Sequence, residues 1–138
     1  MYYNNMIQFL IPFSDWGFLA LRVLVGLLLI PHGVSKLKDL KGTGAWFGSV
    51  GFKPGMFWGT LVALLEVVGG LALALGLLTQ IISALFAIQF VVILLTLKLK
   101  APLKEKELDI LILAASLLFI VSGAGRISLD EYLRIILY

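Results

Sequence analysis

Two ionisable residues, Arg22 and Glu66, lie inside stretches that are otherwise apolar enough to cross a membrane. A charge at the centre of a bilayer costs ~2.5–3.5 kcal/mol on insertion scales, so such residues usually face the interior of a helix bundle and pair with each other. We therefore expect Arg22 and Glu66 to meet between neighbouring spans. There the arginine could stabilise negative charge on a ligand oxygen, and the glutamate could accept or donate a proton.

The expected pair supports two compatible interpretations. As a structural ion pair it would stabilise the bundle, because losing one partner leaves a buried charge at a cost of about 3–5 kcal/mol. As a ligand or proton site it would bind a proton or a quinone-like head group. Gln89, in a third apolar stretch, is expected at a similar depth and joins this candidate site.

The other candidate site residues lie toward one end of the predicted bundle. His32 is near the end of the first apolar stretch, while Glu107 and Asp109 open the fourth. A contact between His32 and either carboxylate would give a route for proton entry or a ligand contact. The simpler interpretation, which we favour, makes His32 a helix-end residue stabilised by the helix dipole.

The composition places these residues in a membrane protein. Of the 138 residues, 61% are hydrophobic and 14% are charged, whereas soluble domains are about 45–50% apolar and about 25% charged. We expect a single all-α membrane domain over residues 1–138. The chain has no cysteine and one histidine, which excludes disulfides and Cys-ligated metal or iron–sulfur centres. No metal, haem or iron–sulfur cluster is predicted, and quinone is the cofactor considered.

Four stretches approach the ~20 apolar residues that a transmembrane helix needs. The predicted spans are residues 16–34, 56–77, 79–97 and 107–124. We expect an integral membrane four-helix bundle with a short interfacial helix near 44–51. Ser128 and Glu131 fit a capping box that opens an amphipathic helix over 127–138. Thr79 is expected to cap the third span.

Glycines and lysines indicate how the spans pack and how they are oriented. Small residues let transmembrane helices approach closely. The glycines predicted to lie at helix contacts are Gly26, Gly33, Gly69, Gly70 and Gly76. Lysines cluster in the link after the first span and in the link before the fourth. Because positive residues favour the cytoplasmic side, both links are expected inside and both termini outside.

Several motifs resemble the DoxX family of small four-helix membrane proteins, which includes DoxD-like proteins. The sequences Arg-Val-Leu-Val-Gly at 22–26 and Pro-His-Gly-Val-Ser-Lys-Leu at 31–37 resemble its first helix, and Glu-Val-Val-Gly-Gly at 66–70 resembles its second. The resemblance implies a protein of the prokaryotic cytoplasmic membrane that is linked to quinone or sulfur redox chemistry. It also implies that Arg22, His32 and Glu66 match the family's polar positions.

Three functions fit these observations. The first is a quinone-linked redox accessory or oxidoreductase subunit, with electrons supplied by a redox partner protein or a small reductant. The alternative is a structural or assembly subunit that packs within a larger complex or with a second copy of itself. A small-solute or proton transporter is less favoured, since the spans lack the interruptions that often mark transport sites. The predicted partners are the lipid bilayer and another protein chain, with no nucleic acid.

Overall fold

Helices and short links make up the described chain. The computed structural model describes residues 8–135. The second and third long helices each contain a π-helical turn, η2 or η3. In chain order the elements are η1 (Gln8–Phe13), α1 (Ser14–Lys38), α2 (Leu40–Ser49), α3 (Gly55–Leu64), η2 (Leu65–Gly69), α4 (Gly70–Leu75), α5 (Thr79–Val92), η3 (Ile93–Leu97), α6 (Leu103–Ser122) and α7 (Leu129–Tyr132).

Within residues 8–135, three helical stretches are long and apolar enough to cross a membrane. These stretches are Leu10–Lys38, Gly55–Leu75 and Thr79–Leu97. They lie where the first three spans are predicted, and the all-α integral membrane bundle is confirmed. Helix α6 occupies the place of the fourth span, but its first half carries charged side chains at positions 104, 105, 106, 107 and 109. The crossing of the membrane by α6 and the assignment of one domain to the whole chain stay predictions.

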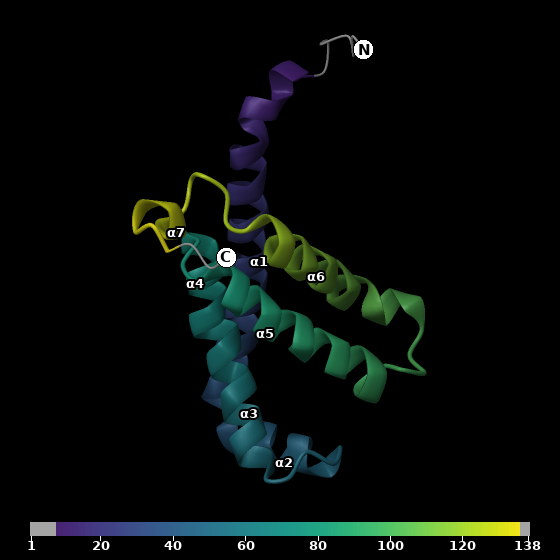
Figure 1. Ribbon diagram of the computed structural model, residues 1–138. Coiled ribbons are helices and arrows are strands. Elements are labelled where there is room, and N and C mark those ends of the chain that lie inside the picture. Colours follow the sequence, from purple (N-terminus) through teal and green to yellow (C-terminus); the bar gives the residue numbers. More distant parts are fainter. Residues whose placement is uncertain (1–7, 136–138) are drawn as a thin grey trace.

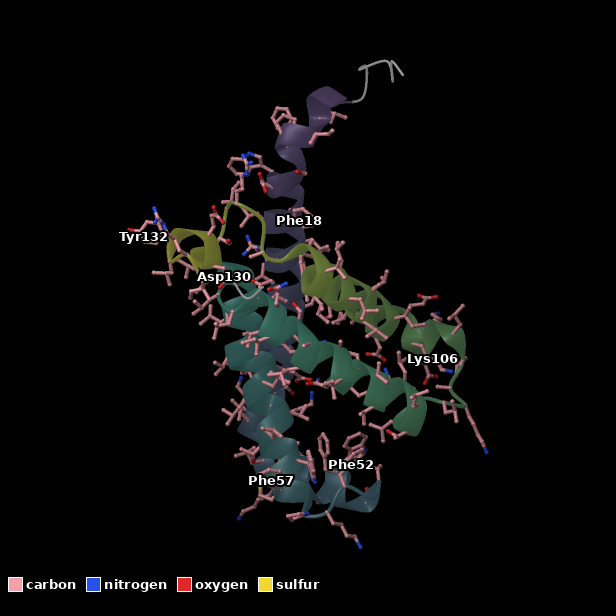
Figure 2. All side chains as sticks on the ribbon, viewed as in Figure 1. Phe18, Phe52, Phe57, Lys106, Asp130 and Tyr132 are labelled. Atoms are coloured by element: carbon pink, nitrogen blue, oxygen red, sulfur yellow. The ribbon has the colours of Figure 1, made fainter. Side chains whose placement is uncertain are left out.

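The long helices form two antiparallel pairs that share one region of contact. Helix α1 runs beside the second long helix, α3–η2–α4, while α5 and α6 form a hairpin that diverges from this first pair (Figure 1). Helix α2 packs on α3 at one end of the molecule, and α7 lies next to α4 at the other (Figure 1). In Figure 2, Phe52 and Phe57 mark the α2–α3 end, and Asp130 and Tyr132 mark the α7 end.

The hydrophobic core fills the region where the two helix pairs meet. Its buried members are Val25, Leu29, Leu73, Phe86, Phe90, Ile112, Ala115 and Phe119. They come from α1, α4, α5 and α6, so this core joins the first pair to the hairpin. Large apolar side chains such as Leu111 and Val121 lie exposed on the outside of α6, as expected where lipid rather than water is the solvent.

Glycines permit the close packing of α1 on the second long helix. A Cβ on Gly26 would lie 2.5 Å from the carbonyl oxygen of Gly70, and a Cβ on Gly33 would lie 2.7 Å from that of Ala63. Gly69 faces the hairpin instead, where its Cβ would lie 3.1 Å from the ring of Phe86. Backbones that approach this closely gain van der Waals contact that larger residues would prevent.

The turn between α4 and α5 is capped from a distant part of the sequence. Gly76 has a φ of 71° and ends α4 in a Schellman motif, with the N–H of Leu77 donating to the carbonyl of Ala72 at 2.8 Å. The side chain of Thr79 does not cap α5, so this prediction is wrong. Instead, the Asp130 carboxylate accepts the N–H groups of Leu78 at 2.6 Å and of Thr79 at 2.9 Å. The first N–H groups of a helix need such partners.

The two short helices, α2 and α7, differ in how closely they match the helices predicted from the sequence. The interfacial helix predicted near 44–51 is α2, which Asp39 caps by accepting the N–H of Gly42 at 2.9 Å. The helix predicted over 127–138 is the single turn α7 in the described part of the chain, and residues 136–138 lie outside it. One half of the expected capping box forms, since Ser128 Oγ accepts the Glu131 N–H at 3.2 Å.

Candidate functional site

The two charges that the sequence predicts to pair lie at different depths of the bundle. Glu66 packs against Gly33 of α1, since a Cβ on Gly33 would lie 2.8 Å from the Cβ of Glu66. Gly33 follows Arg22 by eleven residues, which is roughly 16 Å of helix rise. The expected Arg22–Glu66 ion pair is therefore wrong. Helix α1 continues to Lys38, beyond the predicted end of the span, and a lysine near this end reaches Glu66 instead.

Glu66, Lys36 and Gln89 form a polar cluster between three helices, which we call the Glu66 cluster. The Glu66 side chain is 4% exposed, and its Oε2 accepts from Lys36 Nζ at 2.5 Å. Its Oε1 accepts from Gln89 Nε2 at 2.9 Å. A buried carboxylate held by one cation and one amide donor is satisfied on both oxygens. The sequence analysis expected Gln89 near Glu66, as the structure shows, but it expected Arg22 rather than Lys36 as the cation.

The π-helical turn η2 carries Glu66 into this cluster. The second long helix is α-helical on both sides of η2, which covers Leu65–Gly69. Single π turns inside α-helices are rare and frequently occur at functional sites, because they change the direction in which the following side chains point. The sequence gives no clear signal for this turn beyond the two adjacent glycines, Gly69 and Gly70.

An open hollow of about 390 Å³ adjoins the Glu66 cluster. It is lined by Ser35, Lys36, Asp39, Gly42, Thr43, Trp46 and Phe47. The side chain of Lys36 is 29% exposed, so it connects the hollow to the buried carboxylate. The rings of Trp46 and Phe47 meet edge to face, with centroids 5.1 Å apart. The hollow therefore combines an aromatic wall with a cation that is held by a buried acid.

Arg22 lies at the other end of the first helix pair, in a set of contacts that we call the C-terminal clamp. Its side chain is fully buried. Its Nη2 donates to the carbonyl oxygen of Ile127, and its Nη1 donates to that of Leu73 at 3.5 Å. A Cβ on Gly76 would collide with the guanidinium. Arg22 thus ties the end of α4 to the segment that precedes α7, which is a structural role.

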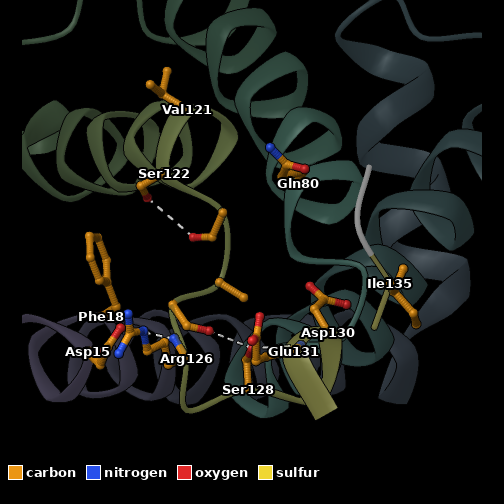
Figure 3. A pocket seen from close by; sticks show the side chains of 13 residues that line it. Asp15, Phe18, Gln80, Val121, Ser122, Arg126, Ser128, Asp130, Glu131 and Ile135 are labelled. Carbon is orange, nitrogen blue, oxygen red and sulfur yellow. Dashed lines mark hydrogen bonds between the residues drawn. The ribbon is translucent and has the colours of Figure 1, made fainter. Parts of the chain in front are cut away.

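An open groove of about 320 Å³ lies beside the clamp (Figure 3). It is lined by Asp15, Phe18, Gln80, Val121, Ser122, Gly123, Ala124, Gly125, Arg126, Ser128, Asp130, Glu131 and Ile135. Two of its carboxylates accept hydrogen bonds from backbone N–H groups. Asp15 accepts the N–H of Arg126 at 2.9 Å, and Asp130 caps α5. These bonds hold the C-terminal segment against α1 and α5, so we assign the groove to the scaffold.

Loss of the Asp130 cap is expected to destabilise the protein. Asp130→Ala leaves the N–H groups of Leu78 and Thr79 without the partners they have in the structure. At about 1 kcal/mol or somewhat more for each bond, the free energy of unfolding should fall by about 2–3 kcal/mol. Titration with sodium dodecyl sulfate in mixed micelles measures it. Glu131→Ala, at an exposed neighbour, is the control, and equal stability of the two variants would contradict the cap.

The remaining predicted site residues do not join the Glu66 cluster. His32 is exposed on α1, and the alternative contact with Glu107 or Asp109 does not form within residues 8–135. Glu107 is exposed, while Asp109 pairs with Lys98 at 2.5 Å. The physical reason is the divergence of the hairpin, which carries the start of α6 away from α1 (Figure 1). In Figure 2 the label on Lys106 marks this region, well apart from the α2–α3 end.

Comparisons with known proteins agree with the motifs of the sequence. A family model described as DoxX matches residues 17–99. A curated protein of Bacillus subtilis (strain 168), "Putative oxidoreductase CatD", is 36% identical over 117 residues, which cover 84% of this chain and 86% of the relative. No solved structure matches. The region matched by the family model contains all three residues of the Glu66 cluster, whereas Asp109 and Asp130 lie beyond it.

Proposed function

The chain belongs to the DoxX family of membrane proteins, and from that premise we propose that it is a redox-linked protein that binds a quinone-class head group at the Glu66 cluster. The observation that supports this proposal is the arrangement of Lys36 between a buried carboxylate and an aromatic-walled hollow. The proposal places the protein in the cytoplasmic membrane of a prokaryote, with its lysine-rich links inside.

A redox role in this chain requires a bound carrier. The sequence contains no cysteine and one histidine, so its side chains offer no thiol couple and no Cys-ligated cluster. A quinone is lipid-soluble and takes up electrons together with protons when it is bound. Electrons would be exchanged with a redox partner protein or a small reductant. The name of the CatD relative is consistent with this class of chemistry.

The residues of the Glu66 cluster fit the needs of such a head group. Lys36 is partly exposed toward the hollow and carries a positive charge that attracts a ligand oxygen. Glu66 is a buried acid whose Oε2 accepts from Lys36, so it holds the ammonium group beside the hollow. The amide of Gln89 fixes the orientation of that carboxylate. Trp46 and Phe47 offer ring faces and edges of the kind on which a planar ring stacks.

Removal of the cation is the direct test of this proposal. Lys36→Met keeps most of the apolar stem and removes the ammonium group, so the affinity for a short-chain benzoquinone should fall by about tenfold, or ~1.4 kcal/mol. Binding is measured by equilibrium dialysis with the full chain in phosphatidylcholine nanodiscs. Lys41→Met serves as the control, since Lys41 is exposed on α2 and does not line the hollow.

Two results would argue against the proposal in different ways. If the unsubstituted protein does not bind the benzoquinone, the quinone site does not exist, and a structural or assembly role becomes the better explanation of the polar cluster. If Lys36→Met binds as well as Lys41→Met, the ligand binds elsewhere. Size-exclusion chromatography of each variant separates lost binding from lost folding.

A further inference from the structure

We infer that the α2–α3 end of the protein binds the headgroups of anionic phospholipids. The feature behind this inference is a set of three exposed lysines beside a cluster of exposed aromatic side chains. Lys38 ends α1, Lys41 lies in the first turn of α2, and Lys53 precedes α3. We call these three lysines the basic rim. The inference goes beyond the proposed quinone site and does not depend on it.

The ammonium groups of the basic rim are available to a partner. All three side chains are exposed, and none of them forms an ion pair within residues 8–135. Lys36 differs, because it is paired with Glu66. The one acid of this segment, Asp39, accepts the N–H of Gly42 and thereby caps α2. The basic rim therefore carries more positive charge than the neighbouring side chains neutralise.

The second lysine-rich segment has a different balance of charge. Residues 98–109 contain four lysines and three acids, whereas residues 36–58 contain four lysines and one acid. In the second segment Lys98 pairs with Asp109, and Lys106 donates to a backbone carbonyl at 2.9 Å. An equal number of lysines therefore leaves a smaller excess of positive charge at the end of the hairpin.

Aromatic rings at the α2–α3 end indicate that it lies at the headgroup level of a bilayer. Contacts between ring edges and ring faces join Trp46, Phe47, Phe52, Trp58 and Phe57 in that order, with centroids between 5.1 and 6.3 Å apart. Both tryptophans and Phe57 are exposed, and Figure 2 shows Phe52 and Phe57 at this end. Tryptophan is enriched at membrane–water interfaces, where one part of the ring is apolar and the N–H stays hydrated.

Close backbone packing holds α2 against α3. A Cβ on Gly55 would collide with the carbonyl oxygen of Gly44, and a Cβ on Gly59 would lie 3.0 Å from Cγ2 of Thr43. The lysines and rings are therefore carried on segments whose positions are fixed before a lipid arrives. Binding to such a preorganised surface requires less ordering of the protein than binding to a flexible loop.

The chemistry of this surface fits a phospholipid with net negative charge, such as phosphatidylglycerol. Its phosphate attracts the basic rim, while the aromatic rings contact the glycerol and the upper part of the acyl chains. Phosphatidylcholine fits less well, because its choline group carries a positive charge that the lysines repel. One lysine near an anionic bilayer surface contributes about fivefold in affinity. Asp39 and Gly42, which lie next to basic-rim lysines in the sequence, line the hollow, so the bound lipid would lie beside its opening.

The experiment measures which lipid contacts the tryptophans at the α2–α3 end. The chain contains three tryptophans, and Trp16→Phe leaves Trp46 and Trp58 as the reporters. The full chain is reconstituted in phosphatidylcholine vesicles in which the same minor fraction of lipid is either brominated phosphatidylglycerol or brominated phosphatidylcholine. Bromine on the acyl chain quenches tryptophan fluorescence on contact. We expect the quenching to give a preference of about fivefold for phosphatidylglycerol.

Loss of lysines from the basic rim supplies the second arm. The double variant Lys38→Gln, Lys53→Gln should lower the preference below about twofold. The matched control is Lys100→Gln, Lys104→Gln, which removes two exposed lysines from the hairpin end and should leave the preference unchanged. Raising the ionic strength from about 0.1 M to about 1 M shortens the Debye length from about 10 Å to about 3 Å, so the preference should also fall in concentrated salt.

Four results would overturn the inference. Equal quenching by the two lipids, with all lysines present, would show that the surface does not select anionic headgroups. A preference that the double variant keeps, or that it and its control lose equally, would show that the basic rim is not the binding surface. If inorganic phosphate at constant ionic strength abolishes the preference, the lysines bind a free anion instead of a lipid.

The outcome is separable from folding and from the quinone proposal. If the double variant does not fold, the comparison of the two lipids at low and high salt, with all lysines present, decides the question. Quinone binding is measured in phosphatidylcholine alone, so the quinone site can fail while the lipid surface stands, and the lipid surface can fail while the quinone site stands.

Discussion

Replacing Gly26 with alanine is expected to lower the free energy of unfolding by about 2–3 kcal/mol, the upper part of the range for overpacked interiors. A Cβ at this position would lie 2.5 Å from the carbonyl oxygen of Gly70 and 2.9 Å from the Cβ of Ala74. Neither atom belongs to a flexible side chain that could turn away. The methyl group can be accommodated only if α1 and α4 move apart, and that movement would weaken the packing on which a membrane bundle depends.

The same helix provides a matched control for this prediction. Gly17 is also in α1, but a Cβ there would meet nothing within 4 Å. Gly17→Ala should therefore leave the stability unchanged or raise it by roughly 0.5–1 kcal/mol, because alanine loses less backbone freedom than glycine in a helix. Both variants can be compared by sodium dodecyl sulfate titration in mixed micelles. If they are equally stable, α1 and α4 are not in close contact at Gly26.

The apolar helices could be predicted from the sequence because their signal is local. A run of about 20 apolar residues has few alternatives to a membrane-spanning helix, and the long helices begin and end close to the predicted positions. The turn at Gly76 was predictable for the same reason. The membrane crossing of α6 stays a prediction, because the charged residues in its first half interrupt the local apolar signal.

The partners of the buried charges could not be predicted in the same way. The sequence places Arg22 and Glu66 in neighbouring spans within reach of a long arginine side chain, but it does not show where distant segments of the chain return. Arg22 is satisfied by Ile127, and the cap on Leu78 comes from Asp130, so both contacts join distant parts of the chain. Lys36 was counted as part of a link, although the long side chain of a lysine at a helix end reaches well beyond its own backbone.

The kind of hydrogen-bond partner distinguishes the scaffold from the candidate site. At one end, buried polar groups bond mainly to backbone atoms, as Arg22 and Asp130 do. At the Glu66 cluster, side chains from three helices bond to one another. Backbone partners satisfy the ends of helices whatever the function, whereas Lys36 joins a side-chain cluster to a hollow and is suited to contact a ligand.

Arg22→Met is expected to lower the free energy of unfolding by about 3–5 kcal/mol. Methionine keeps an apolar stem but cannot donate to the carbonyls of Leu73 and Ile127, and each bond from a charged donor contributes about 1.5–3 kcal/mol. The Asp130 carboxylate also loses the attraction of the nearby guanidinium. Arg126→Met, at an exposed position in the same region, should change stability by less than about 0.5 kcal/mol.

The same variant tests whether Arg22 contributes to ligand binding. Because the α1 backbone at Arg22 lies roughly 16 Å of helix rise from Gly33, which contacts Glu66, and the guanidinium lies against Gly76, the fraction of Arg22→Met that stays folded should bind the benzoquinone with an affinity within about twofold of the unsubstituted protein. Lys36→Met should lose about tenfold under the same conditions. If the two variants lose affinity equally, Arg22 and Glu66 act on one ligand after all. The separation of scaffold from site would then be wrong.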